Sequence, residues 1–198
     1  MSNPRSKIPD RRNENVGSAS GFKDQKRIES YPNIKNHLDQ FRAVITSDNK
    51  PYGLHRARNP YFFQGEKIIS VRKCARPTFT YVDFDSYVSA TFYVIKTERT
   101  NQKYLTGLLN SRLIAFWLKH KGKMQGTNYQ IDKQPLLALP LISPSLDVQA
   151  LVETLVNQIL TAKAAGADTA DLEKEIDKQV YALYNLTQEE IAIVEASE

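Results

Sequence analysis

The chain has 198 residues, of which 41% are hydrophobic and 25% charged, and its net charge is +5. This composition supplies enough apolar material for a core and argues against a wholly disordered chain. No apolar run approaches the roughly 20 residues that span a bilayer, no signal peptide precedes the polar start, and the single cysteine excludes an internal disulfide, so we expect a cytoplasmic protein with no membrane partner.

The chain divides into three predicted regions. Residues 1–28 are rich in Pro, Asn, Ser, Gly and charge without apolar periodicity, and they predict a disordered N-terminal arm. Residues 29–144 predict the main folded domain. Residues 145–198 predict an acidic helical hairpin followed by a short last helix.

The first elements alternate between helical and strand patterns. Apolar residues at helical spacing predict a short amphipathic helix from Pro32 to about Val44. Three segments rich in β-branched and aromatic residues predict strands: Lys67 to Val71, Thr78 to Asp83 and Tyr87 to Lys96. Because only a short turn-like stretch separates the last two, they predict a β-hairpin.

The second half of the sequence is mainly helical. A broad apolar stripe predicts one central core helix from Asn101 to about Lys119. A polar loop is predicted from Gln125 to Gln130, and the apolar run from Leu136 to Ile142 predicts an edge strand or an extended connector.

Two apolar stripes on either side of Gly166 predict the acidic hairpin, and Thr187 with Glu190 has the spacing of a capping box that opens the last helix. The predicted fold class is therefore α+β, with a mixed, largely antiparallel sheet packed with helices and followed by a C-terminal helical hairpin.

Charge is divided unevenly along the sequence. Residues 1–135 contain 24 Lys and Arg against 11 Asp and Glu, a net +13, whereas residues 136–198 contain 3 against 11, a net −8. A basic body of this kind predicts a polyanionic partner such as nucleic acid, and the alternative is a solvated basic face without a partner.

Motifs for catalysis are weak. The segment Asn59-Pro60-Tyr61-Phe62 is similar to the Asn-Pro-Pro-Tyr loop of amino-methyltransferases, but it is one proline short, and no glycine-rich turn for a methyl donor is present. Asp83 and Asp85 occupy a predicted turn, which does not favour a metal-dependent nuclease. The cationic neighbourhood of Cys74 favours a lowered thiol pKa without predicting a nucleophile. We expect no catalytic residue, no cofactor and no metal in this chain.

Two clusters predict binding instead. Arginine forks grip phosphates or guanine edges, lysines act as point charges on the backbone, and Asn and Gln amides suit adenine edges. The predicted DNA-binding residues are Arg56, Arg58, Arg72, Lys73 and Arg76 in the first cluster and Lys121, Lys123, Gln125, Asn128 and Tyr129 in the second.

The order of these motifs resembles the C-terminal specificity (target recognition) domain of adenine-specific DNA methyltransferases and type IIG restriction-modification enzymes, the TaqI-like group. The resembling segments are residues 31–38, 56–60, 67–69, 76–79, 87–88, 103–112, 129–131, 139–140 and 175–187. Each motif alone is weak, and their shared order over some 160 residues carries the resemblance.

The resemblance implies that residues 29–144 form the target recognition domain of a bacterial enzyme and read the sequence of double-stranded DNA. It also implies that S-adenosylmethionine and magnesium belong to a methyltransferase or nuclease domain or subunit absent from this chain, which is either an excised fragment or a separate specificity subunit. The alternative is a protein-interaction scaffold of a DNA-modifying complex, in which the basic face is incidental. The acidic hairpin either packs on the domain's own sheet or docks that partner.

Overall fold

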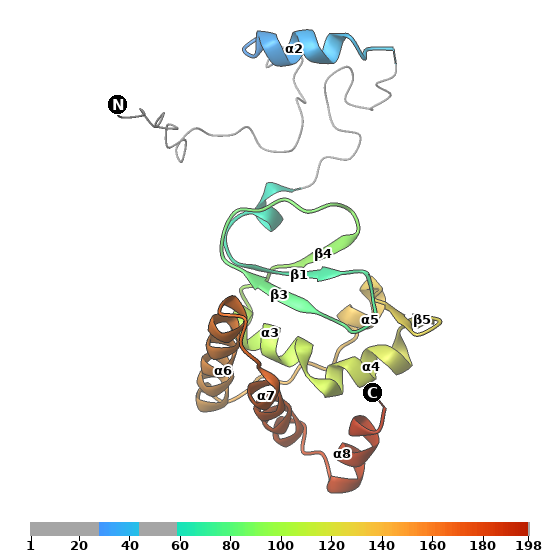
Figure 1. Cartoon of the computed structure of the whole chain (residues 1–198), viewed down its shortest axis with the longest axis vertical. Helices are drawn as coiled ribbons and strands as arrows, with labels where there is room; N and C mark the ends of the chain where they lie inside the picture. The colour runs from blue at the N-terminus through green and yellow to red at the C-terminus, as the bar shows by residue number, and fades with distance from the viewer. Residues whose placement is uncertain (1–27, 44–58, 198) are drawn as a thin grey trace, which may run out of the picture. The chain divides into compact units, whose positions relative to one another are not determined.

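The computed structural model describes residues 28–43 and 59–197, which belong to two compact units, residues 1–61 and residues 62–198 (Figure 1). In the first unit, helix α2 (Pro32–Asp39) begins with a proline in its first turn, as the sequence predicts. It ends at Asp39, earlier than expected, and Val44 lies outside the described residues, as do residues 1–27 of the predicted arm.

Sheet A of the second unit contains the three predicted strands in an unexpected order, and the third begins at Phe92 and not at Tyr87 as predicted. Strand β1 (Lys67–Val71) lies in the centre, between β3 (Phe79–Val82) and β4 (Phe92–Ile95), and it pairs antiparallel with both. The predicted hairpin between the second and third strands is therefore wrong.

Residues 83–91 cross from β3 to the far edge of sheet A because the start of β1 binds them. The Asp85 carboxylate accepts a hydrogen bond from the Gly65 amide (2.8 Å). The fully buried Lys67 ammonium donates to the carbonyls of Gly65 (2.8 Å) and Phe84. These bonds hold the segment across the amino end of β1, so that β4 pairs on the opposite side from β3.

The predicted core helix is two helices. Helices α3 (Gln102–Asn110) and α4 (Arg112–Lys121) are separated by Ser111, whose backbone is extended (φ −67°, ψ 154°). A new helix start needs partners for its free amides. The Ser111 hydroxyl accepts from one of them, and the Asp177 carboxylate accepts from the Arg112 amide (2.8 Å). The side chains of Ser111 and Asp177 thus stabilise the break between α3 and α4, which the continuous apolar pattern of the sequence does not indicate.

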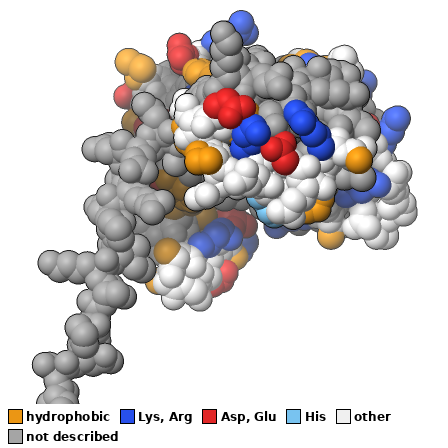
Figure 2. Space-filling model, turned by 90° about the horizontal axis from the view of Figure 1, so that it is seen from above, with side chains coloured by type: hydrophobic (Ala, Val, Ile, Leu, Met, Phe, Trp, Pro, Cys, Tyr) orange, Lys and Arg blue, Asp and Glu red, His pale blue; other side chains and the backbone are white. Residues whose placement is uncertain are grey.

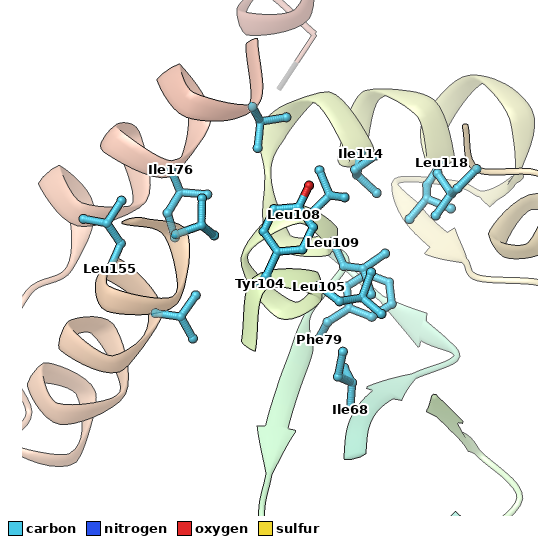
Figure 3. Close-up of a cluster of buried hydrophobic side chains, with 14 of the residues drawn as sticks. Ile68, Phe79, Tyr104, Leu105, Leu108, Leu109, Ile114, Leu118, Leu155 and Ile176 are labelled. Atoms are coloured by element: carbon cyan, nitrogen blue, oxygen red, sulfur yellow. The ribbon is translucent and has the colours of Figure 1, made fainter. Parts of the chain in front are cut away.

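The core is centred on α3, which lies between sheet A and the helices α6 (Leu146–Ala164) and α7 (Ala170–Leu183) (Figure 1). A Cβ on Gly107 would lie 2.7 Å from a methyl group of Val152, so glycine permits the close approach of α3 and α6. Figure 3 shows side chains of α3 and α4 together with those of sheet A and of α6 and α7, namely Ile68, Phe79, Tyr104, Leu105, Leu108, Leu109, Ile114, Leu118, Leu155 and Ile176.

The C-terminal helices are present as predicted. Gly166, with φ of +70°, separates α6 from α7, and α8 (Gln188–Glu195) begins with the capping box of Thr187 and Glu190. The acidic hairpin packs principally on α3 and α4.

Sheet B was not predicted. It consists of β2 (Lys73–Cys74), β5 (Lys123–Gln125) and β6 (Asn128–Gln130) in the order β2-β6-β5. The polar segment from Gln125 to Gln130 is therefore part of a hairpin and not a loop. The run predicted as an edge strand or connector begins within helix α5 (Lys133–Leu137), which packs on α4, and is irregular only afterwards. The α+β class is confirmed.

Asn110 joins α3 to sheet A, and its removal tests this architecture. Its side chain accepts from the Phe79 amide (2.9 Å) and donates to the carbonyls of Phe79 (2.7 Å) and Thr106 (2.8 Å). Asn110→Ala leaves these backbone groups without their partner, so we expect urea unfolding to show a loss of about 2–4 kcal/mol. The control Asn128→Ala, at an exposed position, should change the free energy of unfolding by less than about 0.5 kcal/mol. Equal losses in the two variants would contradict this role.

Candidate nucleic-acid interface

Sheet B joins the two clusters that the sequence presents nearly 50 residues apart. Lys73 in β2 lies opposite Gln130 in β6, and Gln130 lies opposite Lys123 in β5. Residues directly opposite each other in an antiparallel pair have their side chains on the same face. Lys73 of the first cluster therefore shares one row across three strands with Lys123 of the second cluster.

The two faces of sheet B differ in chemistry. Lys73, Lys123, Gln125 and Asn128 are exposed and Gln130 is half-buried; these five residues form the polar face. On the opposite face Cys74, Met124 and Tyr129 are half-buried, and Cys74 and Tyr129 pack against the hydrophobic core.

Tyr129 is thus separated from the other members of the second cluster. It lies opposite Cys74 and Met124, on the core side, whereas Asn128 and Gln130 on either side of it belong to the polar face. Its DNA contact stays a prediction, and its position against the core indicates that it anchors the hairpin.

Two glycines shape the hairpin. Gly126 has φ of +61°, the left-handed conformation that the first central residue of a two-residue hairpin turn requires. At the other end, a Cβ on Gly122 would lie 2.4 Å from the Leu118 carbonyl oxygen, so only glycine permits the close passage from α4 into β5. The chain therefore turns directly from the core helix into the polar face.

Arg72 connects the two sheets. Its amide donates to the Thr91 carbonyl beside β4 (3.0 Å), and its carbonyl accepts from the Ile131 amide after β6 (2.8 Å). The guanidinium lies 5.2 Å from the centre of the Tyr93 ring and 3.8 Å from the Asp132 carboxylate. The backbone of Arg72 is structural, and its half-exposed side chain borders sheet B.

Lys121 lies at the end of α4, one residue before the glycine that leads into β5. Its ammonium is 5.9 Å from the centre of the Trp117 ring. Residues 72–73 and 119–133 together contain six Lys and Arg against one Asp. The surroundings of sheet B are therefore strongly basic. On the face shown in Figure 2, blue basic side chains lie beside red carboxylates.

Arg76 follows β2 by two residues. It lines a cavity of about 320 Å³ between β3, α3, α6 and α7, together with Lys163 and Glu173. Its DNA contact stays a prediction, and its charge acts on Glu173 of the acidic hairpin. Arg56 and Arg58, the remaining members of the first cluster, lie outside the described residues.

Glu173 on the hairpin is held in its charged form. Burial alone would raise its pKa, but hydrogen bonds from Thr169 (2.8 Å) and Lys163 (3.0 Å), with the charges of Lys163 and Arg76, lower the pKa overall. The charge of Arg76, a member of the predicted basic cluster, thus helps to keep the Glu173 carboxylate ionised.

In the described part of the chain, no group of three or more His, Cys, Asp and Glu side chains lies in a metal-binding arrangement. Within the same residues, no helix is both long and apolar enough to cross a bilayer.

Sequence reasoning missed the pairing that makes the site. The alternation of polar Lys123, Gln125, Asn128 and Gln130 with apolar Met124 and Tyr129, on both sides of a Gly-Thr pair, is a hairpin pattern that the segment does contain. A strand of two residues, such as β2, leaves no comparable pattern.

The fold is that of a small α+β domain that carries a polar three-stranded sheet beside its core. Residues 27–141, more than half of the chain, match the family model of the TaqI-like C-terminal specificity domain, and the chain belongs to this family.

The comparison with solved structures agrees with the family match. Seventeen chains match, and one is that of the type IIL restriction-modification enzyme MmeI, in a structure of the enzyme in complex with DNA. It aligns with a TM-score of 0.65 and 16% identity over 85% of this chain. The alignment covers 26% of the MmeI chain, so the present chain spans about a quarter of that length. A comparison with curated proteins finds no match.

Cys74 provides a direct probe of sheet B because it is the single cysteine. Burial raises the pKa of its thiol, so the lowered pKa expected from neighbouring charge is wrong. We expect alkylation by iodoacetamide at pH 8 to be at least about threefold slower than in a free cysteine peptide, because less thiolate is present. Urea should restore the peptide rate. Equal rates in the folded protein and the peptide would contradict the inward position of Cys74.

Glu173→Gln tests the charge contacts of the hairpin. Because the folded-state pKa of Glu173 lies below its unfolded value, its contribution to stability is present above the unfolded pKa and is lost as pH falls through the folded pKa. We expect the variant to be less stable than the wild type at pH 7, with the difference in unfolding free energy shrinking toward pH 3. A difference of the same size at both pH values would contradict this assignment.

Proposed function

We propose that this chain is a double-stranded DNA recognition module of a restriction-modification enzyme and that the polar face of sheet B is its DNA-contacting surface. Family membership supports the general role. The observation that carries the surface assignment is the register that aligns Lys73, Gln130 and Lys123 in one row.

The charges of this row are available to a ligand. Lys73 and Lys123 are exposed, and neither ammonium forms an ion pair with any residue in 28–43 or 59–197. The two lysines lie on either side of β6, so their Cα atoms are about 10 Å apart. Lys121 adds a third charge where α4 ends. Such an array suits a phosphate backbone, whose contacts position the protein on the duplex.

The finer assignment is to a type IIG restriction-modification enzyme or an adenine-specific DNA methyltransferase. In this proposal the catalytic residues, the S-adenosylmethionine site and any magnesium site belong to a methyltransferase or nuclease domain or subunit, and the present chain supplies the recognition part. The resemblance of the ordered motifs supports it, as does the fold shared with one quarter of the MmeI chain.

A protein-contact role is the second candidate function. Phe62, Phe84 and Tyr87 are 40%, 63% and 54% exposed, and Tyr87 stacks on Phe63 with ring centres 5.0 Å apart. Aromatic side chains are enriched in protein interfaces. These residues lie about the amino end of β1, whereas sheet B follows its carboxyl end, so one domain has room for both contacts.

Lysine substitution combined with a salt titration separates the two roles. If about six phosphates are contacted, wild-type affinity for duplex DNA should fall by about 10³ between 50 and 200 mM salt, as counterions are released. The double variant Lys73→Ala, Lys123→Ala should bind more weakly, and its plot of log affinity against log salt should be shallower by about 2, because two phosphate contacts are lost.

The matched control is Lys174→Ala with Lys178→Ala, which removes two exposed lysines from α7. We expect its affinity and salt dependence to equal those of the wild type. Equal effects of the two pairs would contradict the assignment to sheet B, and absence of DNA binding by the wild type would favour the scaffold role.

A further inference from the structure

The tip of the β5–β6 hairpin carries a pair of side-chain amides. Gln125 and Asn128 lie directly opposite each other at the turn of Gly126 and Thr127, and both are exposed. They share the polar face with Lys73 and Lys123, because Gln125 is two residues from Lys123 on the same strand.

The hydrogen-bonding groups of the two amides are unused. Within residues 28–43 and 59–197, neither side-chain amide forms a hydrogen bond, whereas the Gln130 amide donates to Asp132 at 3.2 and 3.3 Å. An amide offers an acceptor and two donors. Gln125 and Asn128 are therefore free to bind a ligand, and Gln130 is occupied in fixing the row behind them.

The tip of the hairpin is open to solvent, and a two-stranded ribbon of this kind fits the major groove of DNA. A Cβ on Gly126 would have no other atom within 4 Å, so the turn faces open space. The major groove of B-DNA is about 12 Å wide and admits a two-stranded β-ribbon. Beyond the two residues of β2, sheet B consists of such a ribbon, formed by β5 and β6.

We propose that the β5–β6 hairpin enters the major groove and that Gln125 and Asn128 determine base preference by contacting adenine edges, while Lys73 and Lys123 bind phosphates. Asn and Gln form paired hydrogen bonds with the N6 and N7 atoms of adenine, which no other base presents together. The inference rests on the proposed function, and it adds which residues read bases and which base they prefer.

The test is selection of bound sequences from a random duplex library with the full chain. The wild type should enrich a motif that contains adenine. The variants Gln125→Ala and Asn128→Ala should each relax the preference at one position, by roughly 5- to 150-fold, while the dependence of affinity on salt stays that of the wild type. In each variant, an unchanged alkylation rate of Cys74 would show that sheet B is intact.

The lysine pair provides the matched control. Lys73→Ala with Lys123→Ala should select the wild-type motif, with lower affinity and a shallower salt dependence. If both amide variants select the wild-type motif, or if the wild type binds without enriching any motif, the proposed base reading is wrong while DNA binding stands. If the wild type does not bind DNA, the proposed function itself fails.

Discussion

The structure depends on the segment that runs from β1 through Arg72 into β2, because this segment belongs to both sheets. Strand β1 is the centre of sheet A, and within two residues the same segment is an edge of sheet B. The Arg72 amide bonds toward β4 and its carbonyl toward the end of β6, so both hydrogen-bonding groups of one residue are used to connect the sheets. The core sheet therefore sets the position of the polar face without a flexible joint.

A second connection reaches sheet B from the helical layer. Helix α4 begins where Ser111 and Asp177 cap its free amides, and it ends at Gly122, whose lack of a side chain lets the chain pass beside the Leu118 carbonyl. Helix α4 is thus fixed at both ends, and it leads directly into the β5–β6 hairpin. Tyr129 of that hairpin also packs against the hydrophobic core. A rigid scaffold with polar residues at a projecting turn is the arrangement that recognition surfaces commonly use.

Local patterns allowed the elements to be predicted, and long-range contacts decided the rest. The bounds of β1 follow from its own residues, and so does the capping box at Thr187. The strand order depends on the bond that Lys67 makes to Phe84, beyond β3. The break at Ser111 depends on the Asp177 carboxylate, which lies 65 residues from its partner Arg112. The sequence alone indicated which basic residues could bind DNA. It did not show that Lys73 and Lys123 lie in one row, because this depends on strand pairing between segments remote in sequence.

Lysine footprinting by mass spectrometry tests the central claim most directly. The chain is treated with an amine-reactive reagent, alone and with duplex DNA, and the modification of each lysine is compared. The account predicts that DNA protects Lys73, Lys121 and Lys123 and leaves Lys174 and Lys178 on α7 as reactive as before, because only the polar face of sheet B and its border contact phosphates. Protection of the α7 lysines with continued modification of Lys73 and Lys123 would contradict it.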